Sequence, residues 1–397
     1  MFGILKKNIE TSWEDHRQAL LAAFSKIIVP EFNQDVVSLD LIRNMEMKNG
    51  KLVVELVLPT FALRSERDCA LAVKKAAIEQ SPHCPDVELN VYADVKPATS
   101  KSIYRENVAD VKNVILVASG KGGVGKSTIA SNLAVALSGL GCRVGLLDAD
   151  VYGPSIPIMF GVAQDTEVQG FSIKGSDETF MMPIEKHGIK LMSIGFLVDT
   201  ASAMIWRGPM IASASMQMFF NVAWGDLDYL IVDLPPGTGD VQLTISQRVA
   251  IAGSVVVSTP QDVALADVVR AKAMFDKVNI PTLGVVENMS YFICDGCDKR
   301  HEIFTSGGAR LAAEKLSLPF LTEIPLDPSV RQGADEGTPL SASAANKSPA
   351  GKAFQALAHE VATRLALAAK KPPVHVPTKP TAAAPIKSVK KGLTVLS

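Results

Sequence analysis

Hydrophobic positions follow two different patterns along the 397-residue chain. From residue 111 onward, short apolar runs alternate with segments whose apolar residues recur at helical spacing. Strands that are apolar along their whole length and separated by helices are typical of a parallel sheet covered on both faces. We therefore expect an α/β fold with a mostly parallel, doubly wound sheet. The predicted strands are Val114–Ser119, Arg143–Leu147, Lys190–Ile194, Tyr229–Asp233, Ser254–Thr259, Thr282–Glu287 and Phe320–Ile324.

The pattern before residue 111 predicts a separate, small α+β domain over residues 11–95. Two strand-like runs flank the segment Lys48-Asn49-Gly50, which is typical of a hairpin turn. Helical stretches precede and follow this hairpin, and another apolar run closes the unit. The expected elements are helices at Ala19–Ile28 and Arg67–Gln80 and strands at Ser38–Met47, Leu52–Leu58 and Val87–Tyr92.

The remaining segments divide the chain further. Residues 96–110 are polar and contain a proline, and we predict that they form a linker to a larger domain over residues 111–369. Residues 370–397 are rich in Pro, Ala and Lys, with six lysines and no acidic residue. This composition predicts a disordered tail, because it offers little apolar surface to bury and its prolines interrupt any continuous amphipathic helix.

Composition narrows the classes of function. The formal net charge of −1 gives no indication of nucleic-acid or anionic-membrane binding. No apolar run reaches the roughly 18–20 residues that span a bilayer, and the N-terminus mixes lysines with acids and lacks the apolar core of a signal peptide. Five scattered cysteines form no disulfide framework. We therefore expect a cytoplasmic protein.

A glycine-rich segment follows the first of the large domain's strands and precedes a helical stretch from Ile129 to Leu140. This order of strand, loop and helix is the context in which the phosphate-binding P-loop pattern is meaningful. Successive backbone N–H groups would surround phosphate oxygens, Lys126 would neutralise the β- and γ-phosphates, and Ser127 would bind Mg²⁺. The predicted nucleotide-binding residues are Gly120, Lys121, Gly122, Gly123, Val124, Gly125, Lys126, Ser127 and Thr128.

Acidic residues at two predicted strand ends would complete this site. Asp233 ends an apolar strand and would hold Mg²⁺ through a water, and Gly237 would offer a backbone N–H to the γ-phosphate. Asp150 would orient the attacking water, and Asp148 would have a structural role or lie near Mg²⁺. The alternative is that both acids merely end a strand. Asn288, which follows another strand, is placed to contact the adenine edge.

Lys121 and a pair of cysteines both suggest a second chain. Lys126 already serves the phosphates of its own loop, so Lys121 would reach a γ-phosphate bound by a partner; the alternative is a solvated loop lysine. Cys294 and Cys297 form a C-x-x-C motif, which is compatible with a redox pair, half a zinc site or half an iron–sulfur site, with His301 as a possible third ligand. A tetrahedral zinc ion and a [4Fe–4S] cluster each take four donors, and a two-fold dimer would supply two from each chain.

With its second lysine, the P-loop resembles the deviant Walker A motif of the MinD/ParA and nitrogenase-iron-protein class. Within that class, residues 111–367 resemble the Mrp/ApbC family of iron–sulfur cluster carriers, and the first 95 residues resemble the small domain that often precedes it. The segments that carry this resemblance are Asp148–Ser155, Trp224–Asp240, Gly284–Ser290, Tyr291–Phe304 and Ile324–Pro328.

The resemblance implies a homodimeric cytosolic ATPase that binds a labile [4Fe–4S] cluster and transfers it to apo-proteins. Lys121 would act across the dimer, Lys126, Ser127 and Asp233 would serve ATP–Mg²⁺, and the two cysteines would bind the cluster. Related N-terminal domains often carry a loop cysteine, but the comparable stretch, Leu58–Leu63, has none. We therefore expect that domain to dock partner proteins or assembly factors rather than clusters.

Three other hypotheses remain open at this stage. A MinD/ParA-type positioning ATPase would need a terminal amphipathic helix or a basic stripe, and it has no use for the cysteine pair. An electron-transferring ATPase would hold a redox cluster more tightly. A zinc ion bridging two chains would make the cysteines purely structural.

Overall fold

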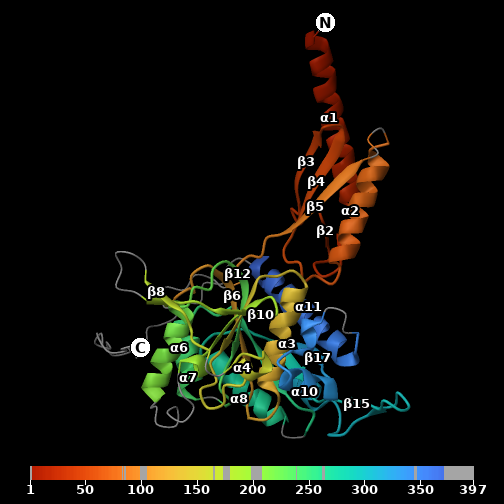
Figure 1. The fold of residues 1–397 in the computed structure, drawn as a ribbon. Coiled ribbons are helices and arrows are strands. Elements are labelled where there is room, and N and C mark those ends of the chain that lie inside the picture. Colours follow the sequence, from red (N-terminus) through yellow and green to blue (C-terminus); the bar gives the residue numbers. More distant parts are fainter. Residues whose placement is uncertain are drawn as a thin grey trace.

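The computed structural model describes residues 2–82, 84, 86–98, 105–163, 166–172, 179–197, 208–237, 239–261, 264–343 and 347–370. Within them, an eight-stranded sheet has the order β10-β11-β7-β12-β6-β13-β14-β17 (Figure 1). Its strands are parallel apart from β10, which pairs antiparallel with β11. Their bounds are Val111–Ala118 (β6), Val144–Asp148 (β7), Ile184–Lys186 (β10), Ile189–Ser193 (β11), Leu227–Asp233 (β12), Gly253–Ser258 (β13), Thr282–Glu287 (β14) and Phe320–Glu323 (β17).

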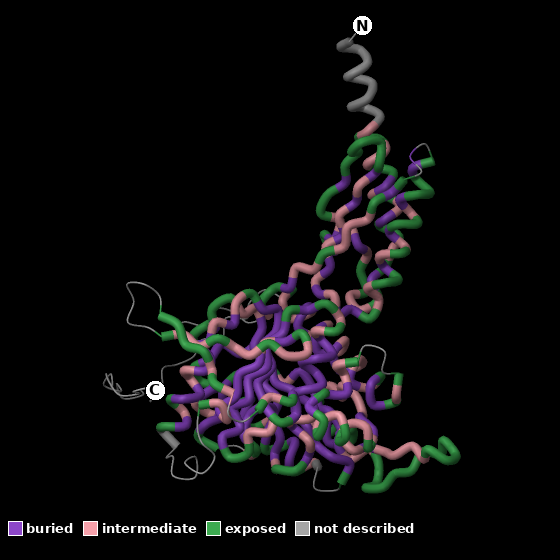
Figure 2. Tube along the Cα trace, viewed as in Figure 1, coloured by how far each residue is buried: buried purple, intermediate pink, exposed green. Residues whose placement is uncertain are grey.

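Helices cover both faces of this sheet, which confirms the predicted doubly wound α/β fold. Successive residues of β6 alternate between two hydrophobic clusters: Ile115 and Val117 belong to one, Val114 and Leu116 to the other. In Figure 2 the central strands are buried along their length. The helices are α3 (Lys126–Gly139) and α11 (Pro349–Lys370) on the first cluster, and α6 (Gly208–Phe220), α7 (Asp240–Arg248), α8 (Ala264–Lys277) and α9 (Gly308–Lys315) on the second.

The N-terminal residues form a smaller unit with its own hydrophobic cluster. Its three-stranded sheet has the order β3-β4-β5, in which β4 pairs antiparallel with β3 and parallel with β5. The elements are α1 (Phe2–Phe24), β1 (Ile28–Val29), β2 (Gln34–Asp35), β3 (Ile42–Lys48), β4 (Lys51–Leu58), α2 (Glu66–Gln80) and β5 (Val87–Ala93).

Three predicted boundaries in this unit were wrong. The first helix begins at Phe2 rather than at Ala19. It ends at Phe24 rather than at Ile28, because Ile28 and Val29 pair with β2. The strand predicted from Ser38 begins at Ile42. The carboxylate of Asp35 accepts hydrogen bonds from the backbone N–H groups of Val37 and Ser38 and holds that segment in a turn.

The loop after β4 packs against the end of the large sheet where the parallel strands begin. The Tyr229 hydroxyl donates to Thr60 Oγ1 over 3.1 Å, and Thr60 Oγ1 lies 3.6 Å from the Cys142 sulfur. His359 Nδ1, in α11, lies 2.8 Å from the Ala62 carbonyl oxygen. Thr60 and Tyr229 are buried, so these polar groups satisfy one another inside the contact between the two units.

Short elements fill the remaining described segments. Among all the described residues, no helix is long and apolar enough to cross a bilayer. The tail was predicted for residues 370–397; Lys370 is instead the last residue of α11, and the rest lie outside the described residues. The short elements are α4 (Ile156–Met159), β8 (Gly170–Ser172), β9 (Thr179–Met181), η1 (Ile194–Phe196), β15 (Phe292–Ile293), β16 (Arg300–His301), α10 (Pro328–Asp335) and η2 (Leu340–Ala342).

Candidate nucleotide site and cysteine arm

The P-loop joins the end of β6 to the start of α3, and packing as well as backbone conformation requires its glycines. Gly123 and Gly125 have φ angles of 80° and 82°, a region that disfavours side chains. A Cβ on Gly120 would lie 2.4 Å from the Asp267 carbonyl oxygen. A Cβ on Gly125 would lie 2.2 Å from the Asn288 side-chain nitrogen. Asp267 and Asn288, from neighbouring elements, therefore leave no room for a side chain at Gly120 or Gly125.

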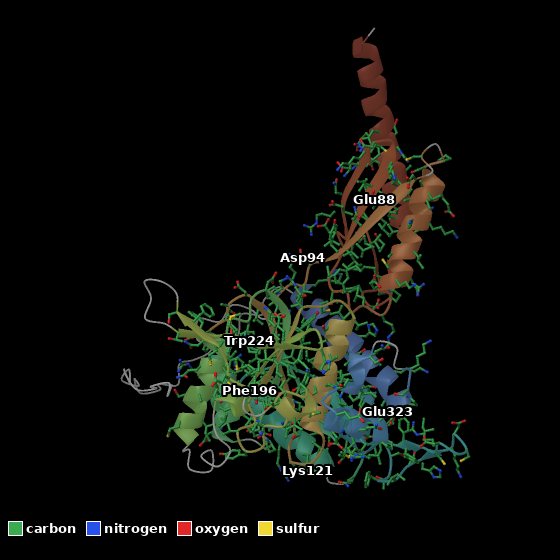
Figure 3. The ribbon with its side chains drawn as sticks, viewed as in Figure 1. Glu88, Asp94, Lys121, Phe196, Trp224 and Glu323 are labelled. Carbon is green, nitrogen blue, oxygen red and sulfur yellow. The ribbon has the colours of Figure 1, made fainter. Side chains whose placement is uncertain are left out.

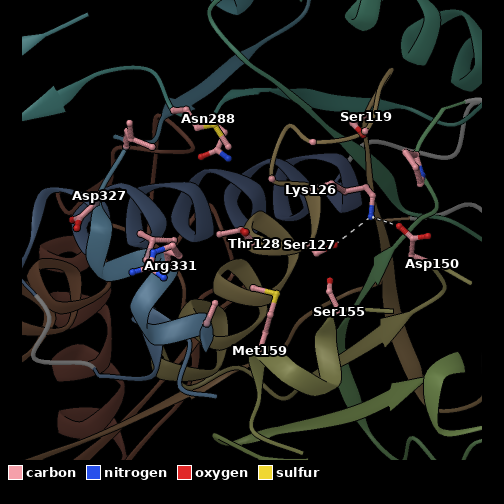
Figure 4. A pocket seen from close by; sticks show the side chains of 18 of the residues that line it. Ser119, Lys126, Ser127, Thr128, Asp150, Ser155, Met159, Asn288, Asp327 and Arg331 are labelled. Atoms are coloured by element: carbon pink, nitrogen blue, oxygen red, sulfur yellow. Dashed lines mark hydrogen bonds and ion pairs between the residues drawn. The ribbon is translucent and has the colours of Figure 1, made fainter. Parts of the chain in front are cut away.

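A cavity of about 450 Å³ lies beside this loop, a size typical of small-ligand sites (Figure 4). Helix α10 forms its other wall, with Val330 and Arg331. The sequence analysis did not assign these wall residues. The predicted site residues that line the cavity are Gly122, Gly123, Gly125, Lys126, Ser127, Thr128, Asp150 and Asn288.

Lys126 lies at the bottom of the site and pairs with two carboxylates. Its ammonium is 2.6 Å from Asp233 Oδ1 and 3.4 Å from Asp150 Oδ2, the second of which is drawn in Figure 4. The lysine side chain is 6% exposed and that of Asp233 is fully buried. Asp150 Oδ1 and Asp233 Oδ2 are also buried and have no hydrogen-bond partner among the described residues. Unpaired carboxylate oxygens next to the Ser127 hydroxyl are the oxygen donors that Mg²⁺ prefers, so these residues fit that ion.

Asp148 is a third buried acid, and its contacts are structural. It lies beside Asp233, because the two residues pair in register on the parallel strands β7 and β12. Its carboxylate accepts hydrogen bonds from the backbone N–H of Asp150, over 3.1 Å, and from the Ser193 hydroxyl, over 2.9 Å. It therefore fixes the turn that presents Asp150, which agrees with the structural one of its two predicted roles.

Burial dominates the electrostatics of the three acids. It raises the pKa of Asp148 to about 8, with the Asp233 carboxylate adding to the effect. Burial also raises the pKa of Asp150 and Asp233, and the Lys126 ammonium opposes the shift in both. Three carboxyl groups share one lysine, so a divalent cation bound here would favour their ionised forms.

Two predicted nucleotide contacts have partners inside the chain. The Asn288 side-chain nitrogen donates to the Val124 carbonyl over 2.9 Å, so the amide predicted to contact adenine holds the P-loop. The Gly237 N–H donates to the Ser119 carbonyl over 3.2 Å. Adenine contact by Asn288 stays a prediction, and so does γ-phosphate contact by Gly237, which requires that bond to break.

Lys121 points away from the cavity, toward helix α8. Its ammonium lies 3.2 Å from Asp267 Oδ2 and 3.5 Å from Gln261 Oε1, and the side chain is 30% exposed. In Figure 3 the residue lies at the rim of the large unit. Asp267, which is buried, was missed by the sequence analysis, because an acid in the first turn of a helix ordinarily indicates only a favourable helix terminus.

The predicted cysteine pair lies at the tip of a projecting hairpin formed by β15 and β16 (Figure 1), and residues 292–301 are called the cysteine arm below. The Cys294 N–H donates to the Lys299 carbonyl over 3.0 Å and closes the tip. Cys297 is exposed and Cys294 is partly exposed. Hydrogen bonds from the Gly296 N–H and from Cys297 lower the pKa of Cys294, which favours the thiolate that binds metals.

Within the described residues, nowhere do three or more His, Cys, Asp or Glu side chains gather as a metal site. His301, considered as a third ligand, lies on β16 opposite Phe292 instead of completing such a group. The arm thus offers two sulfur donors. The remaining thiols are buried, and burial raises the pKa of Cys69 and Cys142 to about 11.

The base of the arm is anchored to β17. The Arg300 guanidinium lies 3.8 Å from the centre of the Tyr291 ring. It also donates to both carboxylate oxygens of Glu323, over 3.0 and 3.3 Å. These hydrogen bonds lower the pKa of Glu323. This bidentate pair and the ring contact fix the direction in which the arm leaves the sheet.

Comparisons with known proteins agree with this geometry. The ParA family model described as NUBPL iron-transfer P-loop NTPase matches residues 110–362. The iron-sulfur cluster carrier protein of Deinococcus radiodurans is 45% identical over 349 residues, which are 88% of this chain and 95% of that protein. An Arabidopsis thaliana protein, described as an iron-sulfur protein required for NADH dehydrogenase, mitochondrial, is 52% identical over 252 residues, 63% of this chain and 78% of that protein. A nucleotide-binding protein of Archaeoglobus fulgidus, solved with ADP, is 42% identical, with a TM-score of 0.50 and coverage of 58% of this chain and 88% of that one.

Proposed function

The chain belongs to the iron-transfer P-loop NTPase family, and from that premise we propose that it hydrolyses ATP and carries a labile [4Fe–4S] cluster held between two copies of itself. Its curated relatives are iron–sulfur cluster carriers. The cluster is cargo, which the dimer would pass to apo-proteins. A reducing compartment such as the cytoplasm suits both exposed thiols and an exchangeable cluster.

The observation that carries this proposal is the placement of Cys294 and Cys297. Both lie at the tip of a projecting arm, and one chain offers two donors where a [4Fe–4S] cluster takes four. A two-fold axis passing between the tips of two arms would bring four thiolates together. Exposure of these sulfurs would keep the cluster accessible to an acceptor protein, as transfer requires.

The nucleotide site would supply the ATPase chemistry. Lys126 would exchange its carboxylate partners for the β- and γ-phosphates, and the P-loop N–H groups would surround the same oxygens. Mg²⁺, held by Ser127 and Asp233, would neutralise charge that develops on the phosphates. Asp150, which has one buried oxygen unpaired, would orient a water for attack on the γ-phosphate.

Lys121 would serve the partner's nucleotide. Its ammonium pairs with Asp267 in its own chain, so dimerisation around ATP would draw the side chain from that carboxylate to the partner's γ-phosphate. This exchange would link hydrolysis to assembly, because a lone chain would lack the second lysine. The same dimer would bring the cysteine arms of the two chains together.

Anaerobic reconstitution with iron and sulfide tests the cluster. The wild type should gain about four irons per two chains, as a [4Fe–4S] cluster requires, with a matching chromophore and Mössbauer spectrum. Cys297→Ala should gain none and still bind ATP, whereas Cys84→Ala, which alters a buried thiol of the N-terminal unit, should load like the wild type. Zinc uptake without a chromophore, or a fully loaded monomer, would contradict the proposal.

Lys121→Ala tests action across the dimer. We expect hydrolysis to fall by about 10³-fold, the scale of a lost cationic group at a phosphoryl transition state, with ATP still bound. Adding an equal amount of Asp150→Ala chains should restore part of the rate, because a mixed dimer pairs an intact Lys121 with an intact Asp150. Lys272→Ala, which removes a lysine that pairs with Asp276 within α8, is the control. Unchanged hydrolysis by Lys121→Ala would rule out the role across the dimer.

A further inference from the structure

We propose that Glu287, the last residue of β14, and Asn288, which follows it, connect the nucleotide site to the cysteine arm. The conformation of the P-loop would then set the reactivity of the two thiols. The inference rests on the proposed function and specifies how its two sites communicate. Both residues are buried, with exposures of 0% and 5%. One contacts the P-loop, and the other contacts both ends of the segment that contains the arm.

Asn288 makes the connection to the P-loop. Its side-chain nitrogen donates to the Val124 carbonyl over 2.9 Å, and its own N–H donates to the Ser258 carbonyl of β13 over 2.8 Å. The amide lies so close to Gly125 that a Cβ there would come within 2.2 Å. With so little free space, a shift of the loop displaces Asn288.

Glu287 makes the connection to both legs of the arm. On the entry side, the Ser290 hydroxyl donates to Glu287 Oε1 over 2.6 Å. On the exit side, the Gly307 N–H donates to the same oxygen over 3.3 Å, and the Ala309 N–H donates to Oε2 over 2.8 Å. The carboxylate therefore caps the N-terminus of α9, where the N–H groups favour a negative charge, and ties that helix to the strand that leads into the arm.

A second set of contacts continues outward from this base. The Ser290 hydroxyl also lies 3.4 Å from Glu323 Oε2, and the Glu323 carboxylate accepts both hydrogen bonds from Arg300. Arg300 belongs to β16 and so to the arm itself. Figure 3 places Glu323 at the side of the large unit from which the arm projects. A continuous series of polar contacts thus joins the arm to Glu287, whose neighbour contacts the P-loop.

Met289, between Asn288 and Ser290, is held in a fixed conformation. Met289 has a φ of 56°, a left-handed conformation that is uncommon for a residue with a long side chain. The backbone on either side fixes it, since the Asn288 N–H is bonded to Ser258 and the Ser290 N–H donates to the Ile324 carbonyl over 2.9 Å. A segment fixed in this way transmits displacement to its neighbours instead of absorbing it.

The P-loop has a reason to change when nucleotide binds. In this structure Lys126 pairs with Asp233 and Asp150, and phosphates would compete for the same ammonium. The Val124 carbonyl, to which Asn288 donates, is two residues from that lysine. By linkage, if bound nucleotide changes the affinity of the thiols for a ligand, that ligand changes the affinity for nucleotide by the same factor.

Thiol alkylation tests the connection directly. Metal-free protein is treated anaerobically with iodoacetamide, alone and with saturating ADP or a non-hydrolysable ATP analogue, and the rates at Cys294 and Cys297 are read by mass spectrometry. Coupling in the usual range predicts that nucleotide changes the wild-type rate by about fivefold or more. In Glu287→Gln, whose amide would oppose a backbone N–H, the change should shrink to within about twofold. Nucleotide occupancy of each variant is confirmed by calorimetry.

Two further variants keep the test decisive. Arg300→Ala changes a side chain on the surface, should fold, and should also reduce the nucleotide effect, so a misfolded Glu287→Gln does not end the test. Glu106→Gln alters an exposed ion pair with Arg248 and should keep the wild-type ratio. A wild type without a nucleotide effect, or Glu287→Gln and Arg300→Ala variants that retain it, would overturn the inference.

Iron–sulfide loading of the same preparations separates this inference from the proposed function. Normal loading without any effect of nucleotide on the thiols would refute the connection and leave the carrier function standing. A clear effect of nucleotide in a protein that takes up no cluster would refute the function and leave the connection standing.

Discussion

In the nucleotide site the charged groups are covered, with Lys126 6% exposed and Asp233 fully buried, whereas Cys297 at the tip of the arm is exposed. The lysine has partners within its own chain, and helices α3 and α10 wall the cavity beside it. The arm has two residues in each strand and two sulfur donors. The difference teaches that the charged groups beside the cavity find partners within one chain, whereas the arm presents two sulfur donors, to which the proposed function adds two more from a second chain.

Replacing Lys126, in the buried nucleotide site, should have the largest effect on stability and ligand affinity. Lys126→Ala leaves Asp233 and Asp150 facing each other without a cation, which should lower the free energy of unfolding by about 3 kcal/mol. ADP affinity should fall by about 100-fold, because a charge-assisted phosphate contact is lost. Urea unfolding and calorimetric titration measure the two effects.

The matched control is Lys112→Ala. Lys112 also pairs with a buried aspartate, Asp228, over 3.1 Å, but Arg143 contacts the same carboxylate and remains after the substitution. We expect a loss below about 1 kcal/mol. Equal losses in the two variants would mean that the acids of the nucleotide site do not depend on their lysine.

The pH dependence of stability sharpens the comparison, because the three acids whose pKa burial raises all lie in the nucleotide site. Burial and the Asp233 carboxylate raise the pKa of Asp148 to about 8, from 3.8 for the free side chain. The folded chain therefore holds this proton more tightly, so the stabilisation is complete below about pH 4 and is lost as the pH rises toward 8. Without Mg²⁺ or nucleotide, the wild type should lose up to about 1.4 kcal/mol per pH unit relative to Asp148→Asn.

Urea unfolding at pH 5, 6 and 7 gives that slope. Asp276→Asn, an exposed change on α8, should leave the pH dependence as in the wild type. A difference between wild type and Asp148→Asn that stays constant with pH would show that Asp148 is ionised throughout and that Lys126 compensates its charge.

The smallest effect is expected in the arm. Ile293 is half-buried in β15, so Ile293→Ala should lower the free energy of unfolding by less than about 1 kcal/mol. Ile231→Ala makes the same chemical change in a fully buried strand and should cost about 2–5 kcal/mol. Chemical denaturation of both variants measures the contrast. A large loss for Ile293→Ala would mean that the arm is integral to the core.

The apolar pattern was sufficient for the seven parallel strands of the large sheet, because most of them are buried along their length and leave a clear signal in sequence. The antiparallel strand β10 was missed because it lies at the edge, where its three residues are half-exposed or exposed. Ser38 was assigned to a strand because the hydrogen bonds that Asp35 makes to the following turn are not visible in an apolar pattern.

The site was predictable where a motif fixes the chemistry and unpredictable where tertiary contacts decide. The loop and Lys126 follow β6 and Asp150 follows β7, the two strands on either side of β12, so all of them converge on one cavity at the carboxyl ends of parallel strands. The partners of Lys121 and Asn288 could not be foreseen. Asp267 and Val124 are remote from them in sequence, and only the packing of α8 and β14 against the P-loop brings them together.

The Tyr229–Thr60 hydrogen bond joins the N-terminal unit to the beginning of β12, the strand that ends at Asp233. Its seven residues span about 23 Å, at about 3.3 Å per residue. An acceptor protein bound by the N-terminal unit would therefore lie at the opposite end of the strands from the nucleotide site. Transfer of the cluster would then require an acceptor long enough to extend from the N-terminal unit past the large unit to the cysteine arm. Alternatively, the thiols of one copy would pass the cluster to an acceptor bound to the N-terminal unit of a neighbouring copy.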